Sequence, residues 1–561
     1  MRPEYGCAAI NERSAPKEAI GAENVASGKQ DLNLHTGEVV ELYKRTLFIA
    51  ILFLTSGDVV FAQPSSTAGS PGDTSHNVAT KSPDPGTFFL YPERIALKDG
   101  GFFNAERGMM FVPANRSKKN SAVIAVEVYR FRAAEKANPE TPPLFYLHGG
   151  PRFGGLERSL EELGTFEARW RPFLNVSDVV VVSQRGIGPS KPTTIIETTT
   201  KPLRPDQPYD NEKAIAEYQQ ALEKEKATWE ELGVDLSGFT VVEAAADVDD
   251  VRKALGYDKM VIWGGSFGSH WGMAIMRFYP EFVERAILTA MEGPDHTYDH
   301  PGHFWKVFER VAEEAEGAPE FEGLVPEGGL IKALETVIRR VEKKSFKVTV
   351  SLPETNESQD VLFDAQSIRR LAGGYSGGLP AWPADVIDLY NGDFSKAAES
   401  VVRRYNGSAN SLVQFREKSR FHHQGRSFLT ASYYVLDCGS GITAERLAEY
   451  DTDPALEILG EMNWKYTSAC SVWDSDLGDG FRQNFETEIP TVIVHGTWDL
   501  STPYENALEL VPYFRNSKFI PVKRGPHGSI HEAMRTSEKF KKGIMKFLET
   551  GDMSELPDGV E

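Results

Sequence analysis

The chain of 561 residues has little cysteine and lacks a long hydrophobic run. Its three cysteines, Cys7, Cys438 and Cys470, are too few for a disulfide-rich scaffold or for a zinc site built from four cysteines. No apolar run reaches the roughly 18 to 20 residues that a membrane-spanning helix requires. These absences leave a globular protein with a hydrophobic core as the expected class.

Positive charge is scarcer than negative charge. The chain has 61 lysine and arginine residues against 81 aspartate and glutamate residues, which gives a formal net charge of −20 at pH 7. A nucleic-acid backbone or an anionic membrane surface would be repelled at long range, so neither is expected as the main partner. Hydrophobic residues make up 40% of the chain, which argues against wholesale disorder and supplies a large core.

One short apolar run near the N-terminus has the features of a secretory signal. Two basic residues precede the run at 46–55, and a cleavage site ends at Ala62. We expect residues 1–62 to form an N-terminal extension and signal peptide, and residues 63–86, rich in Ser, Thr, Pro and Gly, to form a flexible linker. The protein is then secreted or periplasmic, with no stable membrane insertion after cleavage. A buried helix or an uncleaved anchor is the alternative for this run.

Short apolar runs of strand length alternate with helical patterns along much of the chain. Six runs are expected to be buried strands, at 143–147, 178–183, 259–263, 286–290, 491–494 and 518–522. Thr240 and Glu243 form a capping box before an amphipathic helix, and Thr502 and Glu505 form a second one. This alternation predicts an α/β fold with a mostly parallel sheet flanked by helices.

The pattern becomes mainly helical between residues 295 and 486. Helices are expected at 304–316, 330–344, 394–405 and 444–461, with one short alternating strand at 346–350. We therefore expect the fold to be interrupted by an inserted cap. The predicted parts are a first core segment at 87–294, a mainly helical cap at 295–486 and a second core segment at 487–561.

A candidate nucleophile lies in the motif Gly-x-Ser-x-Gly at 264–268. Ser266 follows a buried strand and precedes a helical pattern, the context in which a sharp turn presents a serine hydroxyl above a sheet. A second match surrounds Ser376, but no strand precedes it and Pro380 follows closely. We interpret Ser376 as a loop residue.

A serine nucleophile needs a base, and the base needs an acid that orients it. Asp499 lies just after one predicted strand and His527 just after the last one, in the chain order Ser, Asp, His. Each residue alone is compatible with an ordinary turn or loop position. Together with Ser266 they predict a catalytic triad of Ser266, Asp499 and His527.

A glycine-rich loop at 148–151 follows the first predicted core strand. Backbone N–H groups of Gly149 and Gly150, with that of Phe267, are the expected oxyanion hole. His148 in this loop is interpreted as a structural residue, with a second base as the alternative.

These motifs together resemble the proline iminopeptidase and tripeptidyl aminopeptidase branch of the α/β-hydrolases. The resemblance covers roughly 140–294 and 487–549. It is carried by the segments 148–151, 183–190, 245–256, 264–268, 496–503 and 525–527. Two residues depart from the family pattern, namely Arg152 in place of a glycine and Ser183 in place of an acid. Arg152 puts the identity of the substrate in doubt.

The resemblance implies removal of residues from a free peptide N-terminus, with a cap that restricts entry and acidic side chains that hold the α-ammonium. Glu292 is the candidate amine anchor and Asp295 a weaker one. A substitute triad acid and a hinge salt bridge are the alternatives for Glu292. Peptides with a free N-terminus are the expected partners, and the release of one or of three residues stays open.

Cys438 and Cys470 are expected to form a disulfide if the protein is exported, and two buried thiols are the alternative. His296, His300 and His303 have spacings that suit a metal, but Pro301 and Gly302 break the helix that would align them. No metal and no cofactor are therefore expected. A secreted carboxylesterase or amidase with the same triad is the rival function, and a ligand-binding relative without catalysis is disfavoured by the complete triad.

Overall fold

The computed structural model describes residues 83–96, 102–151, 171–186, 195–196, 204–231, 233, 235–351, 358–373, 379–403, 405, 429–473 and 475–561. The predicted signal segment, most of the predicted linker, Cys7, Arg152 and Ser376 lie outside these residues. Within the described ranges, no helix is both long enough and apolar enough to cross a bilayer. Residues Pro83–Glu561 form one compact unit.

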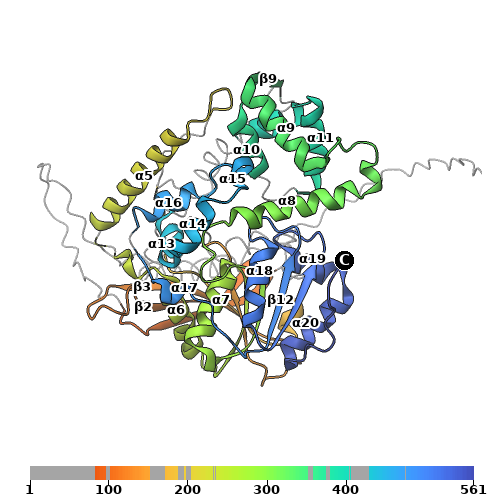
Figure 1. Cartoon of the computed structure of the whole chain (residues 1–561). Coiled ribbons are helices and arrows are strands. Elements are labelled where there is room, and N and C mark those ends of the chain that lie inside the picture. The colour runs from red at the N-terminus through yellow and green to blue at the C-terminus, as the bar shows by residue number, and fades with distance from the viewer. Residues whose placement is uncertain are drawn as a thin grey trace, which may run out of the picture. The chain divides into compact units, whose positions relative to one another are not determined.

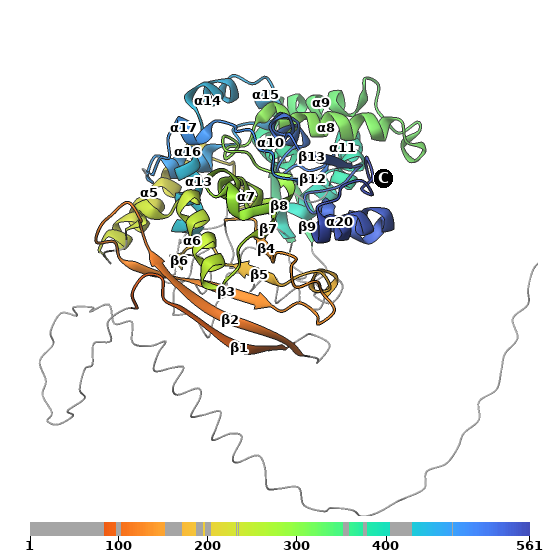
Figure 2. The same cartoon turned by 90° about the horizontal axis from the view of Figure 1, so that it is seen from below.

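A nine-stranded sheet forms the centre of this unit, in the spatial order β1-β2-β3-β5-β4-β7-β8-β12-β13 (Figure 2). Six neighbouring strands from β5 to β13 run parallel, and β1, β2 and β3 are antiparallel. The strands are β1 (Phe88–Ala96), β2 (Phe102–Pro113), β3 (Val123–Phe131), β4 (Leu144–Leu147), β5 (Val179–Val182), β7 (Met260–Ser266), β8 (Val283–Met291), β12 (Thr491–Gly496) and β13 (Ser517–Val522). The predicted α/β fold with a mostly parallel sheet is confirmed.

All six predicted core strands are present, but three further strands were not predicted. β1, β2 and β3 form an antiparallel meander at one edge of the sheet. β1 contains Pro92, Glu93 and Arg94, and its exposed edge leaves Tyr91 62% accessible. Such a polar edge strand has no continuous apolar run, which is why its sequence resembles a loop.

Helices cover both faces of the sheet. On one face, α6 (Val241–Ala254), α7 (Phe267–Phe278) and α18 (Tyr504–Leu510) enclose a core that includes Val248, Trp271 and Leu288. On the other face, α4 (Arg171–Leu174), α19 (Ser529–Thr536) and α20 (Glu538–Thr550) pack over β5, β7 and β12. Inner strands such as β5 and β12 are thus buried on both sides, as their uniformly apolar sequences require.

The chain between β8 and β12 is mainly helical and has a hydrophobic core of its own. Figure 1 shows α8, α9, α10 and α11 gathered beyond the ends of the strands. The elements are α8 (Pro301–Glu316), α9 (Gly329–Lys343), β9 (Phe346–Ser351), β10 (Ser358–Phe363), α10 (Ala365–Gly373), α11 (Trp382–Asn391), β11 (Leu429–Thr430), α13 (Ala431–Ser440), α14 (Ala444–Asp451), α15 (Leu456–Leu459), α16 (Trp464–Cys470) and α17 (Asp479–Arg482). The single helix expected at 444–461 is divided, with Pro454 between its two parts.

Two elements precede α6 and link the core to the inserted region. β6 (Ile195–Ile196) pairs with β11, and α5 (Asn211–Glu231) packs on α16. In the latter contact the rings of Tyr218 and Trp464 meet edge to face, with 5.4 Å between their centroids. The apolar stripe of α5 is therefore a packing surface.

The two predicted capping boxes differ in outcome. Thr240 caps α6, because its hydroxyl accepts a hydrogen bond from the Glu243 N–H at 3.3 Å. The second capping box is wrong. α18 begins at Tyr504 after Pro503, and the Thr502 hydroxyl instead donates to Asp499 Oδ2 at 2.9 Å. The buried carboxylate competes successfully for this donor.

Candidate active site

The candidate nucleophile lies in a strained turn between β7 and α7. Ser266 is the last residue of β7 and has φ 56° and ψ −133°, a left-handed conformation that non-glycine residues rarely adopt. A Cβ on Gly264 would lie 2.1 Å from the Gly268 carbonyl oxygen, and one on Gly268 would lie 2.1 Å from the Leu147 carbonyl oxygen. Only glycine fits at these two positions, so the motif is a consequence of backbone packing.

The glycine-rich loop after β4 lies directly against this turn. A Cβ on Gly149 would stand 3.0 Å from the Gly265 carbonyl oxygen and 3.2 Å from Ser266 Cβ. Gly150 has a φ of +128°, and the Gln184 side chain holds the loop by donating to the His148 carbonyl at 3.0 Å. Phe267 is the first residue of α7, so its N–H has no acceptor within that helix. The loop and the helix start thus place backbone donors beside Ser266.

His527 and Asp499 are in direct contact. His527 Nδ1 lies 2.9 Å from Asp499 Oδ2 and 3.0 Å from Oδ1. Asp499 is fully buried and also accepts hydrogen bonds from the Ser501 and Thr502 backbone N–H groups and from the Thr502 hydroxyl. A carboxylate held by this many donors has a fixed orientation and directs a hydrogen on Nδ1 toward itself. The Nε2 atom of His527 is then the nitrogen that can accept a proton.

The charges of this pair stabilise each other. Burial alone would lower the pKa of His527, but the adjacent Asp499 carboxylate outweighs burial and leaves that pKa raised. Burial would likewise raise the pKa of Asp499, and the charge and hydrogen bond of His527 reverse this and lower it. The pair therefore favours an ionised acid beside a basic imidazole.

Ser266, Asp499 and His527 all follow the carboxyl ends of parallel strands, so they lie at the same edge of the sheet. The register aligns Gly265 of β7 with Thr289 of β8, and Thr289 with Val494 of β12. In the part of the chain that the structure describes, no hydrogen bond joins Ser266 Oγ to His527. The sheet brings the nucleophile and the acid–base pair to one edge.

Three carboxyl groups gather near the nucleophile turn. Glu292 follows β8, Asp299 precedes α8 and Asp437 lies in α13, and each interacts electrostatically with at least one of the others. Burial, with a contribution from Asp299, raises the pKa of Glu292 to about 8. Burial raises the pKa of Asp299 to about 6, and burial and the other two carboxylates raise the pKa of Asp437.

Among the described residues, none of these three side chains forms a hydrogen bond or an ion pair. Asp437 nevertheless is almost completely buried, with 3% of its surface exposed. Burying unpaired carboxylates is costly unless a ligand supplies a positive charge. The cluster touches the nucleophile turn through backbone and hydroxyl groups. The Glu292 N–H donates to Ser269 Oγ at 2.9 Å, and that hydroxyl donates to the Ser266 carbonyl at 2.7 Å.

Asp295, the second predicted amine-binding residue, lies apart from this arrangement. Its two carboxylate oxygens accept hydrogen bonds from the Thr443 N–H at 2.9 Å and from the Thr443 hydroxyl at 2.8 Å. Thr443 is the residue that caps α14. Asp295 therefore ties the segment after β8 to the start of a helix of the inserted region.

The three histidines with metal-like spacing have other partners. His296 Nε2 lies 2.9 Å from Glu509 Oε2, and His303 Nδ1 lies 2.8 Å from Asn506 Oδ1. The rings of His300 and His303 stack with 3.9 Å between their centroids. Within the described ranges, no group of three His, Cys, Asp or Glu side chains is arranged to hold a metal ion.

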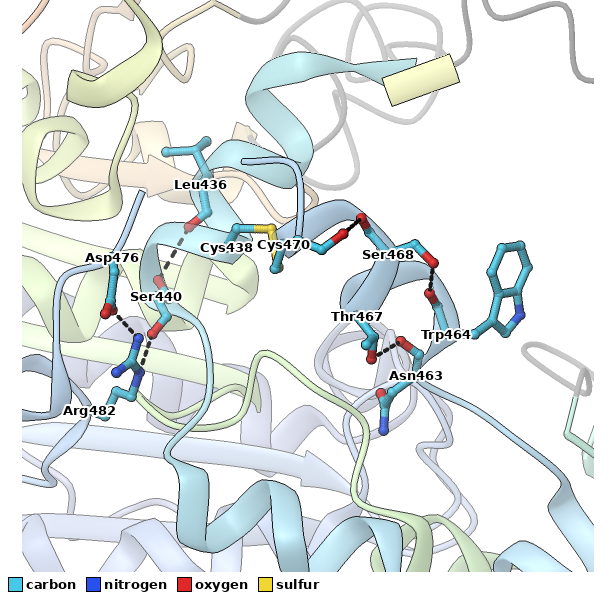
Figure 3. Close-up of a disulfide and its surroundings, with 11 residues drawn as sticks. Leu436, Cys438, Ser440, Asn463, Trp464, Thr467, Ser468, Cys470, Asp476 and Arg482 are labelled. Carbon is cyan, nitrogen blue, oxygen red and sulfur yellow. Dashed lines mark hydrogen bonds and ion pairs between the residues drawn. A yellow bond between two sulfur atoms is a disulfide. The ribbon is translucent and has the colours of Figure 1, made fainter. Parts of the chain in front are cut away.

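A disulfide joins Cys438 to Cys470 in the structure, with 5.0 Å between the two Cα atoms (Figure 3). It links α13 to α16, and Cys438 directly follows Asp437. At the end of α13 the Ser440 carbonyl accepts a hydrogen bond from Arg482 Nε at 2.7 Å. The helix that carries Asp437 is thus held at both its cysteine and its last residue.

Asp299 and Asp437 were not predicted as site residues, and Thr502 was predicted only as a helix cap and not as a partner of Asp499. Asp437 stands alone in the apolar stretch 433–438, and a single carboxylate in such a stretch is the signal that was available. Asp299 lies in a polar segment where nothing in the sequence distinguishes it. Ser183, which departs from the family pattern, is buried, and its hydroxyl lies 3.5 Å from Glu127 Oε2.

Comparisons with known families agree with this geometry. Residues 142–315 match a family described as the alpha/beta hydrolase fold, and residues 457–560 match a family described as TAP-like protein. The first segment contains the Ser266 turn and the second contains Asp499 and His527.

Three curated relatives are similar over parts of the chain. The tripeptidyl aminopeptidase of Streptomyces coelicolor is 23% identical over 440 residues, which cover 75% of this chain and 77% of the relative. The proline iminopeptidase of Neisseria meningitidis is 27% identical over 162 residues, 29% of this chain and 36% of the relative. The serine protease Hip1 of Mycobacterium tuberculosis is 27% identical over 202 residues, 34% of this chain and 36% of the relative. The chain is thus an α/β-hydrolase, similar in sequence to the tripeptidyl aminopeptidase and proline iminopeptidase family.

Proposed function

We propose that the protein is a secreted serine aminopeptidase that cleaves peptides near a free N-terminus through Ser266, His527 and Asp499. The observation that carries the aminopeptidase assignment is a cluster of three carboxyl groups, of which Asp437 is buried and Glu292 and Asp299 are half-buried, with no hydrogen bond or ion pair to their side chains among the described residues. Glu292, Asp299 and Asp437 form a cation-binding environment beside the nucleophile turn. The α-ammonium group of a peptide supplies the charge that this cluster lacks.

The proposed reaction follows from the positions of the groups. Ser266 Oγ attacks the scissile carbonyl while His527 Nε2 accepts its proton, and Asp499 stabilises the resulting imidazolium through Nδ1. The N–H group of Phe267 and those of Gly149 and Gly150 stabilise the oxyanion. His527 then returns the proton to the leaving amine, and water releases the peptide fragment from Ser266 by the same steps in reverse.

Glu292 is the proposed main anchor of the α-ammonium, with Asp437 and Asp299 beside it. Ionisation of Glu292 is unfavourable in the empty site, where burial and Asp299 raise its pKa to about 8. An ammonium group within hydrogen-bond distance reverses that balance and favours the carboxylate. Asp295 is left to its contacts with Thr443.

We also propose that a signal peptide ending near Ala62 directs the protein out of the cytoplasm. The disulfide between Cys438 and Cys470 supports this proposal, because such bonds persist in oxidising compartments. N-terminal sequencing of the exported protein tests the proposal, since a mature chain that begins after Ala62 is expected. A chain that keeps the run 46–55 when purified from the medium or periplasm contradicts it.

The aminopeptidase assignment is tested with matched chromogenic substrates. The panel contains peptide anilides with a free N-terminus, the same peptides with an acetylated N-terminus, and simple aryl esters. We expect the free peptides to be cleaved at least about 100-fold more efficiently than the acetylated ones, because an acetylated N-terminus carries no ammonium group to pair with the carboxylates. Equal cleavage of both peptide forms, or activity on esters alone, favours the rival carboxylesterase or amidase.

A further inference from the structure

His270 is a buried histidine outside the proposed triad. It lies in the second turn of α7, four residues after Ser266, and is 1% exposed. Its ring contacts those of Phe267 and Phe481, with centroid distances of 5.6 and 5.7 Å. Such packing fixes the plane of the imidazole.

Both nitrogens of His270 have partners. Nδ1 lies 3.0 Å from the Gly293 carbonyl oxygen, and Nε2 lies 2.8 Å from Ser440 Oγ. A carbonyl oxygen only accepts hydrogen bonds, so Nδ1 carries the hydrogen, and Nε2 of the neutral ring accepts from the Ser440 hydroxyl. Burial lowers the pKa of His270 to about 4, so the ring is neutral over the physiological range.

The two partners of His270 lie next to two carboxylates of the cluster in the chain or on the same helix. Gly293 directly follows Glu292, and Ser440 lies three residues after Asp437 on α13. Residues three apart in a helix lie on the same side of it, one turn from each other. One imidazole thus connects the helix that starts at the nucleophile to both of the segments that carry the proposed ammonium anchor.

The far end of this connection is itself fixed. Figure 3 shows Ser440 at the end of α13, where Arg482 binds its carbonyl, and Cys438 of the Cys438–Cys470 disulfide lies two residues before it. On the other side, Ser269 joins the Glu292 N–H to the Ser266 carbonyl. The bond between His270 and Ser440 therefore joins the nucleophile helix to the part of α13 that carries Asp437.

We propose that His270 is a positioning residue that sets the span between Ser266 and the carboxylates Glu292 and Asp437, and thereby the number of residues released from the peptide N-terminus. This inference rests on the proposed function and deepens it. Each peptide residue adds about 3.3 to 3.6 Å to an extended chain, so an anchor that selects one cleavage position must be held within a fraction of that length. Displacements of about 1 Å in reacting groups already reduce rates about 100-fold.

The main test replaces His270 with phenylalanine, which keeps a ring in the core and removes both hydrogen bonds. For H270F we expect KM of free peptide anilides to rise at least 10-fold with a smaller change in kcat, and cleavage of aryl esters to stay within about threefold of the wild type. Mass spectrometry of products from unlabelled peptides should show cleavage at neighbouring positions as well as at the original one. His270→Gln, whose amide can both donate and accept, should restore part of the original selectivity.

A second set of variants covers the case in which H270F does not fold. Ser440→Ala removes only the hydroxyl and should shift KM and the product pattern in the same direction. If H270F folds, the double variant with Ser440→Ala should show less than the sum of the two single effects, because both remove the same bond. Ser468→Ala is the matched control, since its buried hydroxyl lies on the neighbouring helix α16 and donates to the Trp464 carbonyl.

The outcomes separate this inference from the proposed function. If wild-type enzyme cleaves free and acetylated peptides equally, the proposed function fails before any variant is made. If the wild type prefers free peptides but Ser440→Ala and H270F leave KM and the product pattern unchanged, or reduce ester and peptide cleavage equally, the positioning role is overturned.

Discussion

The Nδ1 atom of His527 lies 2.9 Å from Oδ2 of Asp499, a carboxylate that is fully buried and accepts three further hydrogen bonds from Ser501 and Thr502. This arrangement fixes which ring nitrogen carries the hydrogen. The basicity of His527 and the direction of its free nitrogen both depend on Asp499.

Replacing Asp499 with asparagine should abolish most of the activity. An amide at this position presents a donor to Nδ1 and favours the wrong tautomer, so kcat should fall by about 10⁴-fold while the fold is kept. The measurement is kcat on an aryl ester, with circular dichroism as the control for folding. Thr502→Val, which removes one of the donors to Asp499, should cost no more than about 10-fold. A folded D499N enzyme with near-normal kcat contradicts the assignment of the acid.

The pH dependence of ester cleavage reports on the same pair. Ester substrates have no amine to bind Glu292, so the ionisation of Glu292 should not affect their cleavage. The rising limb of kcat/KM then follows the deprotonation of His527. Since the pKa of His527 is raised above its usual 6.5 by Asp499 against the opposing effect of burial, the midpoint of this limb should lie above pH 6.5. In D499N the effect of burial remains and the limb should move to lower pH. A wild-type midpoint below pH 6 is incompatible with this account.

Gly149→Ala tests the contact between the glycine-rich loop and the nucleophile turn. The new methyl group would stand 3.0 Å from the Gly265 carbonyl oxygen and 3.2 Å from Ser266 Cβ, so the loop must move away. Displacement of an oxyanion donor typically costs 10²- to 10³-fold, and we expect a loss of about that size in kcat. Gly480→Ala is the control, because no atom lies within 4 Å of its added methyl group. Normal activity of G149A would remove this loop from the oxyanion hole.

Glu292→Gln should stabilise the protein while it impairs cleavage of free peptides. The pKa of Glu292 is about 8 in the folded state, compared with a usual value of 4.5. Between pH 4.5 and pH 8 the native state therefore keeps a proton on Glu292 that the unfolded chain has lost. The stability contributed by this proton is present at low pH and is lost as pH rises toward 8. We therefore expect E292Q to raise Tm by on the order of 2 °C at pH 8 and to leave it unchanged at pH 4. A lower Tm at pH 8 would mean that Glu292 is paired in the native state.

Removal of the disulfide should loosen α13 and reduce stability. The chain-entropy relation for a loop of this length gives about 3 to 4 kcal/mol. We expect the Cys438→Ser, Cys470→Ser double variant to unfold at a lower denaturant concentration than the wild type. Dithiothreitol should move the wild-type midpoint toward that of the variant and leave the variant unaffected. Identical midpoints of oxidised wild type and double variant would show that the bond does not stabilise the fold.

Local patterns predicted the parallel core well. Runs such as Val179–Val182 are apolar on both faces, and the turn at Ser266 is specified by glycines whose Cβ atoms would overlap the backbone. The edge strand β1 escaped prediction because Pro92, Glu93 and Arg94 interrupt any apolar pattern. Edge strands are held by their neighbours and not by their own hydrophobicity.

The carboxylate cluster depends on contacts between distant parts of the chain. Glu292 was identified because it follows a core strand, whereas Asp437 reaches the same place from α13 through the packing of the inserted region. The partner of Thr502 was also missed, since a capping role and a bond to Asp499 use the same hydroxyl and only the tertiary structure decides between them. Sequence patterns therefore located site residues that follow core strands, such as Glu292. They did not locate residues such as Asp437, which helices of the inserted region bring to the same site.

Covalent labelling of the nucleophile tests the central claim most directly. The wild-type protein is incubated with an aryl phosphonate, and the adduct is located by intact-mass measurement and peptide mapping. The account predicts one adduct, on Ser266, which is absent in Ser266→Ala and forms at least about 10³-fold more slowly in His527→Ala. An adduct on another residue, or labelling of Ser266 at an unchanged rate in His527→Ala, would contradict the proposal that these two side chains act together.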